Sequence, residues 1–156
     1  MKKTISVIGS ANPDKKDYDF AYKLGELIGE KDLVLVCGGL GGIMEAVSKG
    51  VKSTGGITVG ILPEENKQSM NPYIDIPIVT GMGEARNIII ALTADVVIAV
   101  GGELGTLSEL AISMKHKKPV IGLNTWDLDK EYCKKVNIIE VHDPQEAIDK
   151  AISLIR

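Results

Sequence analysis

Short apolar runs alternate with longer amphipathic stretches along this chain. The runs are almost continuously apolar, which is typical of strands that helices cover on both faces of a parallel sheet. They are Thr4–Gly9, Leu33–Cys37, Ile57–Leu62, Asp95–Val100 and Pro119–Leu123, with weaker candidates at Ile76–Val79 and Ile138–Val141.

Apolar residues at helical spacing predict a helix after most of these strands. The predicted helices are Tyr18–Glu30, Ile43–Ser53, Glu84–Ala94, Thr106–Lys117 and Pro144–Ile155. Asp143 is a suitable N-cap for the last helix, with Pro144 in its first position. The alternation predicts a Rossmann-like α/β fold of three layers (α/β/α), with a mostly parallel sheet of about six or seven strands. A length of 156 residues fits a single nucleotide-binding domain, residues 1–156.

Composition and charge limit the classes of partner. A net charge of -3 gives no general attraction to nucleic acid or to an anionic membrane, and an aromatic content of 4% argues against a base-stacking surface. The N-terminus runs directly into a strand pattern, and no apolar run is long enough to span a bilayer. We therefore expect a cytoplasmic protein that binds a small molecule, with no nucleic-acid or membrane partner. His116 and His142 have no partners at metal-ligand spacing, so no metal site is expected.

Three turns rich in glycine follow predicted strands, at Gly9–Asn12, Gly38–Gly42 and Gly101–Thr106. The carboxyl ends of parallel strands share one edge, where such sheets bind ligands. Glycine lets the backbone approach a ligand closely, and the N-terminus of the helix that follows favours an anion. One such turn could serve packing alone, but three on one edge predict a phosphate-binding site.

The glycine turns do not match the common nucleotide fingerprints. The cluster at Gly38–Gly42 follows the second strand, and Met44 stands where the third glycine of a dinucleotide motif is required. The chain also lacks a P-loop sequence. NAD and ATP are therefore poor candidates, and the segment Pro63–Asp75, the one long irregular stretch, is a candidate functional loop.

Thr106-Leu107-Ser108-Glu109 has two interpretations. Its spacing fits a capping box, with Thr106 as N-cap and Glu109 bonding back to it. Alternatively, Glu109 faces a bound ligand at the sheet edge, and both statements could hold together.

Arg86 lies at the opening of a predicted helix, where the helix dipole disfavours a cation by a few tenths to about 1 kcal/mol. Its side chain could be solvated or paired with Glu84. It could instead pair with a ligand anion, or with Glu109 across the site.

These motifs resemble a superfamily that contains the LONELY GUY phosphoribohydrolases, the so-called possible lysine decarboxylases and the molybdenum cofactor carrier proteins. Residues 101–109 (GGELGTLSE) are similar to the family's GGxxGTxxE, and residues 38–46 are similar to its glycine-rich motif in the carrier-like form. Val100 and Asn87 stand where the hydrolases usually have Pro and Lys, which resembles the short carrier-type branch.

The resemblance implies site residues and two alternative functions. It makes Arg86 and Glu109 the catalytic pair of a hydrolase that cleaves the N-glycosidic bond of a nucleoside 5′-monophosphate, with no cofactor required. The alternative is a non-catalytic carrier or sensor of a nucleotide or a molybdenum–pterin cofactor. Together with the glycine turns, the candidate phosphate- and ligand-binding residues are Gly9, Ser10, Gly39, Gly41, Gly42, Met82, Asn87, Gly101, Gly102, Gly105 and Thr106.

Two apolar helix surfaces predict self-association. Residues 88–92 are apolar on every face of their helix, and the next helix carries an apolar stripe of Leu107, Leu110, Ala111 and Met114. The family resemblance likewise implies a homodimer or a higher homo-oligomer.

Overall fold

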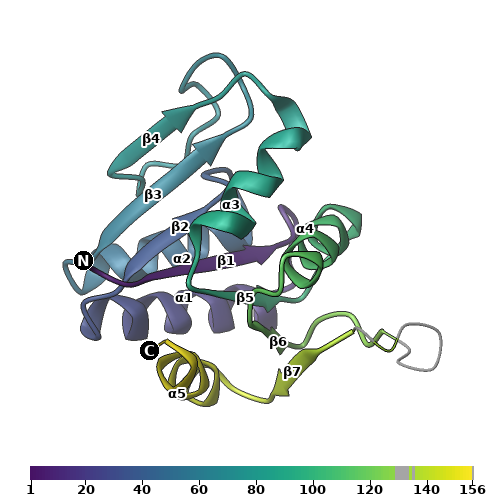
Figure 1. The fold of residues 1–156 in the computed structure, drawn as a ribbon. Coiled ribbons are helices and arrows are strands. Elements are labelled where there is room, and N and C mark those ends of the chain that lie inside the picture. Colours follow the sequence, from purple (N-terminus) through teal and green to yellow (C-terminus); the bar gives the residue numbers. More distant parts are fainter. Residues whose placement is uncertain (129–133, 135, 156) are drawn as a thin grey trace.

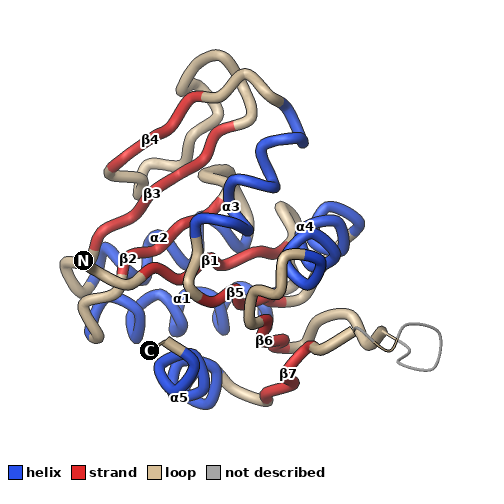
Figure 2. The backbone as a smooth tube through the Cα atoms, viewed as in Figure 1, coloured by secondary structure: helices blue, strands red, loops and turns tan. Residues whose placement is uncertain are grey.

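The computed structural model describes residues 1–128, 134 and 136–155. Its strands pair in parallel to form one sheet in the order β4-β3-β2-β1-β5-β6-β7 (Figure 1). The strands are β1 Thr4–Gly9, β2 Val34–Cys37, β3 Ile57–Leu62, β4 Ile76–Val79, β5 Val96–Val100, β6 Val120–Leu123 and β7 Ile138–Val141. The helices are α1 Lys15–Glu30, α2 Ile43–Ser53, the 3-10 helix η1 Gly83–Arg86, α3 Asn87–Thr93, α4 Leu104–Lys115 and α5 Pro144–Leu154 (Figure 2).

The predicted α/β architecture is confirmed, and the seven predicted strands are all present. Four have the predicted bounds, and β2, β5 and β6 each begin one residue later than predicted. Before β5, Asp95 accepts hydrogen bonds from the Thr4 backbone N–H (2.8 Å) and hydroxyl (3.1 Å).

Several helix starts differ from the prediction. Helix α1 begins at Lys15 rather than Tyr18, because Asp14 is its N-cap and accepts a hydrogen bond from the Asp17 N–H at 2.8 Å. The segment predicted as one helix from Glu84 is divided into η1 and the short α3. The cap predicted for α5 is confirmed, since Asp143 accepts from the Glu146 N–H at 2.8 Å and Pro144 is the first helical residue.

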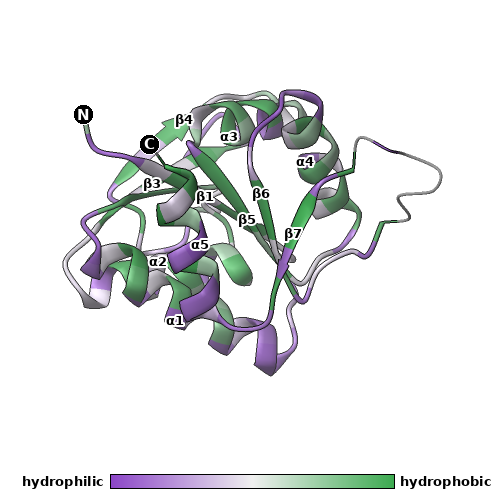
Figure 3. Ribbon diagram, turned by 60° about the horizontal axis from the view of Figure 1, so that its bottom comes forward, coloured by the Kyte–Doolittle hydropathy of each residue, from purple (hydrophilic) through white to green (hydrophobic). Residues whose placement is uncertain are grey.

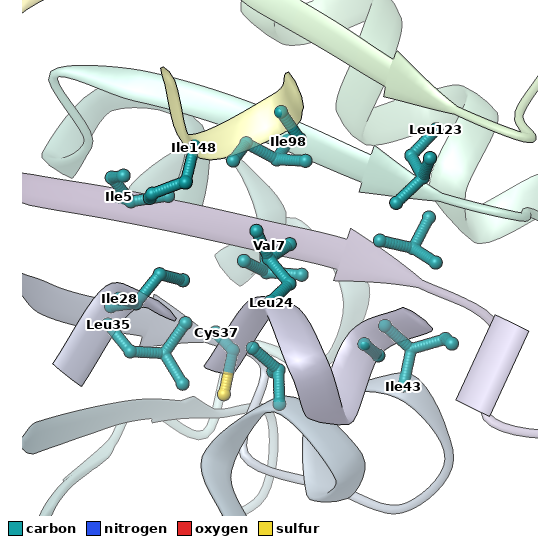
Figure 4. Close-up of a cluster of buried hydrophobic side chains, with 14 of the residues drawn as sticks. Ile5, Val7, Leu24, Ile28, Leu35, Cys37, Ile43, Ile98, Leu123 and Ile148 are labelled. Atoms are coloured by element: carbon teal, nitrogen blue, oxygen red, sulfur yellow. The ribbon is translucent and has the colours of Figure 1, made fainter. Parts of the chain in front are cut away.

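Helices cover both faces of the sheet. Helices α1, α2 and α5 cover one face, where their apolar side chains meet those of β1, β2, β5 and β6 (Figure 4). Helices α3 and α4 cover the other face with a smaller core that includes Ile90 and Leu110. Strand β1 is buried from both sides, with Ile5 and Val7 in the first core and Ile8 in the second. The apolar strands therefore lie in the middle of the molecule, with the polar helix surfaces outside (Figure 3).

The direction in which strands are added reverses between β1 and β5. From β1 the chain adds β2, β3 and β4 on one side, and then returns to add β5, β6 and β7 on the other. Parallel α/β sheets bind ligands in the crevice at such a switch point. The glycine turns that follow β1, β2 and β5 therefore lie on three neighbouring strands at this point.

The irregular segment between β3 and β4 is tied to the glycine turn after β2. The Asn71 N–H donates to the Gly39 carbonyl, and the Asn71 side-chain amide donates to the Leu40 carbonyl, each at 2.9 Å. Asn71 is only 4% exposed, so these bonds are shielded from water. The segment is thus anchored at Asn71, in its second half.

No helix in the described part of the chain is both long and apolar enough to cross a membrane.

Candidate functional site

A cavity of about 520 Å³ opens at the carboxyl edge of the sheet, where the strand order reverses. Its size is in the range of pockets that hold nucleotide-sized ligands. Residues from the turns after β1 and β2, the segment after β3, η1 and the start of α4 form its wall. They are Gly9, Ser10, Ala11, Leu40, Met44, Pro63, Glu64, Gly83, Glu84, Arg86, Asn87, Glu103, Gly105, Thr106 and Glu109.

Two of the glycine turns are in direct contact. The Ile43 N–H, at the start of α2, donates to the Ser10 carbonyl at 3.0 Å. Gly42 has a φ of 66°, and a Cβ at this position would overlap the carbonyl oxygens of Ser10 and Ala11. Gly42 therefore holds the turn after β1 against the N-terminus of α2.

Arg86 reaches the cavity from η1 and is buried, with 8% of its surface exposed. One end of its guanidinium donates to the side-chain oxygen of Asn87. Another nitrogen, Nη2, lies so close to Gly38 that a Cβ there would be 2.8 Å from it. The Nε atom is buried without a hydrogen-bond partner. The interpretation of Arg86 as a solvated cation is therefore wrong.

Glu109 enters the same cavity from α4 and is also 8% exposed. Burial raises the pKa of its carboxyl from 4.5 to about 7, and the nearby positive charge of Arg86 opposes that shift. Burial in turn lowers the pKa of Arg86, and the charge of Glu109 opposes this change. Within the described part of the chain no carboxylate oxygen lies within 4.0 Å of an Arg86 nitrogen. Neither Glu84 nor Glu109 therefore forms an ion pair with Arg86.

The capping-box interpretation of Thr106 and Glu109 is wrong. Helix α4 begins at Leu104 with Glu103 in the N-cap position, so Thr106 already lies inside the helix. The Thr106 hydroxyl is buried without a hydrogen-bond partner, and the side chain is 2% exposed. Both residues instead contribute to the cavity wall.

The remaining carboxylates of the cavity lie at its rim. Glu64, Glu84 and Glu103 are exposed to solvent, and Glu64 accepts a hydrogen bond from the Ser69 hydroxyl. Arg86 is the single cationic side chain among the described residues of the wall. The rim is therefore acidic, while the interior holds one buried cation and one buried carboxyl.

The structure brings together seven of the predicted site residues, and six lie outside the wall. Those in the wall are Gly9, Ser10, Arg86, Asn87, Gly105, Thr106 and Glu109, and those outside it are Gly39, Gly41, Gly42, Met82, Gly101 and Gly102. Gly101 has a φ of 58°, and a Cβ there would overlap the carboxylate of Asp17 in α1. Gly42 and Gly101 therefore shape the turns around the cavity.

Sequence reasoning missed several wall residues. Pro63 and Glu64 follow β3, Leu40 lies between the glycines after β2, and Met44 lies in the first turn of α2. Because Leu40 and Met44 lie within or next to a glycine motif, the sequence could have suggested that they line the cavity. Pro63 and Glu64 begin the segment predicted as a candidate functional loop, but no motif in that segment singles them out.

No group of three or more His, Cys, Asp or Glu side chains in residues 1–128, 134 and 136–155 is arranged to hold a metal ion.

Comparison with known proteins shows which family this chain resembles. The model of the SLOG cluster4 family matches residues 2–150. An uncharacterised protein of Archaeoglobus fulgidus is 46% identical over 149 residues, which cover 96% of this chain and 94% of that protein.

Two solved structures are similar over nearly the whole chain. The molybdenum cofactor binding protein of Rippkaea orientalis is 40% identical, with a TM-score of 0.94 and coverage of 100% of this chain and 99% of that one. The molybdenum cofactor carrier protein of Chlamydomonas reinhardtii is 34% identical, with a TM-score of 0.88 and coverage of 98% of both chains.

Proposed function

This chain belongs to the SLOG cluster4 family, and we propose that its cavity binds a molybdenum–pterin cofactor, which the protein carries without converting it. The similarity to a molybdenum cofactor binding protein and to a molybdenum cofactor carrier protein supports this function. Those relatives also support a place in the carrier-type branch of the resemblance.

The observation that carries the proposal is a pair of buried polar atoms without partners in one cavity. They are Arg86 Nε and Thr106 Oγ1. Buried polar groups in folded proteins are nearly always hydrogen-bonded, and an unpartnered one costs about 1–3 kcal/mol. A ligand that supplies acceptor oxygens would remove that cost. We infer that a phosphate is held near these two atoms.

The described residues fit the polar groups of such a cofactor. A phosphate oxygen can accept hydrogen bonds from Arg86 Nε and from the Thr106 hydroxyl, and charge-assisted bonds of this kind are the stronger ones. The backbone N–H groups at the start of α4, around Gly105, favour the same anion. When bound, the cofactor would supply the metal chemistry, and the residues of this chain would hold its phosphate and pterin ends.

The N-glycosidic hydrolase is the second candidate. Its support is the presence of Arg86 and Glu109 in one cavity, since a carboxyl with a pKa near 7 suits general acid–base catalysis. The two named relatives are described as binding or carrying a cofactor, so they favour the carrier function. Product analysis distinguishes the two functions.

Binding of released cofactor tests the proposal. Purified protein is mixed with molybdenum cofactor released from a molybdoenzyme, and the molybdenum and pterin that co-elute with it on gel filtration are measured. We expect retention by the wild type, and at least tenfold weaker binding by Arg86→Gln and Thr106→Val. Each change removes a hydrogen-bond donor to the phosphate, and a hydrogen bond to a charged group contributes about 1.5–3 kcal/mol.

Glu30→Gln is the matched control, because Glu30 is an exposed carboxylate at the end of α1, outside the cavity wall. It should bind like the wild type. Loss of binding in the control but not in the other two variants would contradict the assigned phosphate site. Release of a free base from any nucleoside 5′-monophosphate would instead establish the hydrolase.

A further inference from the structure

The interior of the cavity contains a carboxyl group that the phosphate site does not use. Glu109 is more than nine-tenths buried, lines the cavity and has no side-chain hydrogen bond within the described part of the chain. The carboxylates Glu64, Glu84 and Glu103 are exposed to solvent, whereas only 8% of the surface of Glu109 is exposed. Any ligand that fills the cavity removes its remaining water.

The chemistry of Glu109 limits what can lie against it. An ionised carboxylate only accepts hydrogen bonds, so a phosphate oxygen next to it would be repelled. A ligand cation at this place would be repelled by the nearby positive charge of Arg86. The group that fits is a neutral pair of N–H donors, since its two parallel bonds match the two carboxylate oxygens.

An amino-oxopyrimidine ring offers this donor pair. In a 2-amino-4-oxopyrimidine the ring N–H and the exocyclic amino group lie side by side in one plane, without a formal charge. Pterin and guanine present this same edge. Adenine has an acceptor nitrogen in place of the ring N–H, and hypoxanthine keeps the ring N–H but lacks the amino group.

We propose that Glu109 selects ligands of this cavity by accepting two hydrogen bonds from the 2-amino-4-oxopyrimidine edge of their ring system. The inference deepens the proposed function, because it rests on the same cavity and names the residue that recognises the pterin end. In this arrangement Arg86 and Thr106 hold the phosphate, and Glu109 holds the ring. The cavity then discriminates by the heterocycle as well as by the anion.

Four stable probes test this selection by isothermal titration calorimetry at pH 8, where Glu109 is largely ionised. They are GMP, IMP, AMP and ribose 5-phosphate, of which the first three share a ribose 5-phosphate group and differ only in the base. We expect the affinity to fall from GMP to IMP to AMP, by about tenfold for each N–H lost, because hydrogen bonds to a charged group are strong.

Two variants assign the effect to one side chain. Glu109→Gln keeps the size of the side chain and presents N–H donors in place of one carboxylate oxygen. It should reduce the affinity for GMP to that for AMP. The affinity for AMP itself should stay within about threefold of the wild-type value. The control Glu30→Gln removes an exposed carboxylate outside the cavity wall and should keep the full order. Thermal unfolding of each variant verifies that it is folded.

The outcomes separate this inference from the proposed function. An unchanged order of affinities in Glu109→Gln, or equal affinities in the wild type, overturns the selection by Glu109 even if the molybdenum cofactor binds. An equal loss of affinity for GMP and for ribose 5-phosphate in Glu109→Gln also overturns it, since Glu109 would then contact the sugar. If neither the nucleotides nor the cofactor bind, the proposed function fails as well.

Discussion

The position of Arg86 depends on a residue that carries no side chain. A Cβ on Gly38 would lie 2.8 Å from Arg86 Nη2 and 2.7 Å from the sulfur of Met44. Both neighbours are the far ends of flexible side chains. We therefore expect Gly38→Ala to fold, with the Arg86 guanidinium displaced from its position. Binding of the molybdenum cofactor should weaken by tenfold or more, with a stability loss below about 2 kcal/mol. Gel filtration with released cofactor and urea unfolding measure the two effects.

Gly41→Ala is the matched control for this change. Gly41 lies in the same turn, but a Cβ there would meet no atom within 4 Å. This variant should bind as the wild type does. Equal losses in both variants would mean that the turn itself, and not the position of Arg86, is sensitive to substitution.

Single residues of the site could be predicted where a motif placed them. Arg86, Thr106 and Glu109 came from such motifs, and the structure places all three in one cavity. The sequence could not decide between a capping box and a ligand-binding role, because the positions of Thr106 and Glu109 are compatible with both. The decision depends on where α4 begins, and this is two residues earlier, after Glu103. Likewise, no local pattern reveals that Gly38 lies against Arg86, because η1 is far from it in sequence.

At the scale of elements, helices α1 and α2 touch through their backbones. A Cβ on Gly25 would overlap the carbonyl oxygen of Val47, and one on Gly50 would overlap that of Tyr22. Alanine normally stabilises a helix relative to glycine by about 1 kcal/mol. For Gly25→Ala we expect the opposite sign, a loss of about 2–4 kcal/mol in the free energy of unfolding, because the two helices must separate. Urea unfolding monitored by circular dichroism measures this loss of stability.

Gly105→Ala is the comparison for this prediction. Gly105 lies in the first turn of α4, and a Cβ there would meet no atom within 4 Å. Its substitution should leave stability unchanged or raise it by up to about 1 kcal/mol. If Gly25→Ala were equally harmless, the close crossing of α1 and α2 would be contradicted.

The elements themselves followed closely from the sequence. Runs of apolar residues predicted the strands to within one residue, because strands buried on both faces are mostly apolar. Helix ends were less accurate, since the caps Asp14 and Glu103 lie outside the apolar periodicity. The contact between Gly25 and Gly50 could not be predicted, because it requires knowing which helices are neighbours.

At the scale of the whole molecule, the sequence predicted a parallel sheet but not the order of its strands. The five strong apolar runs are similar to one another, so nothing in them says which strands pair. The two weaker runs became β4 and β7, the strands at the two edges of the sheet. Pro77 and Glu140 interrupt their apolar pattern, as is common where a strand has only one neighbour. The switch point between β1 and β5 emerges only from the assembled sheet.

The stability of the whole fold should report on Glu109. Its pKa is about 7 in the folded protein and near 4.3 in an unfolded chain, so between these values the folded state binds more protons. The free energy of unfolding therefore falls as the pH rises from about 4.5 to 7. Above pH 7 the whole penalty of about 3 kcal/mol is present. The charged or titratable groups facing Glu109 are Arg86 and Cys37, and burial raises the pKa of the Cys37 thiol.

We therefore expect Glu109→Gln to stabilise the free protein more at pH 8 than at pH 5. A gain of about 3 kcal/mol corresponds to a rise in Tm of roughly 6–12 °C for a chain of this length. Scanning calorimetry at both pH values measures the difference between the two proteins, in which the titration of all other groups cancels. A difference independent of pH would contradict the buried state of Glu109. A bound ligand that donates to Glu109 should reduce the difference at pH 8, because it stabilises the ionised carboxylate only in the wild type.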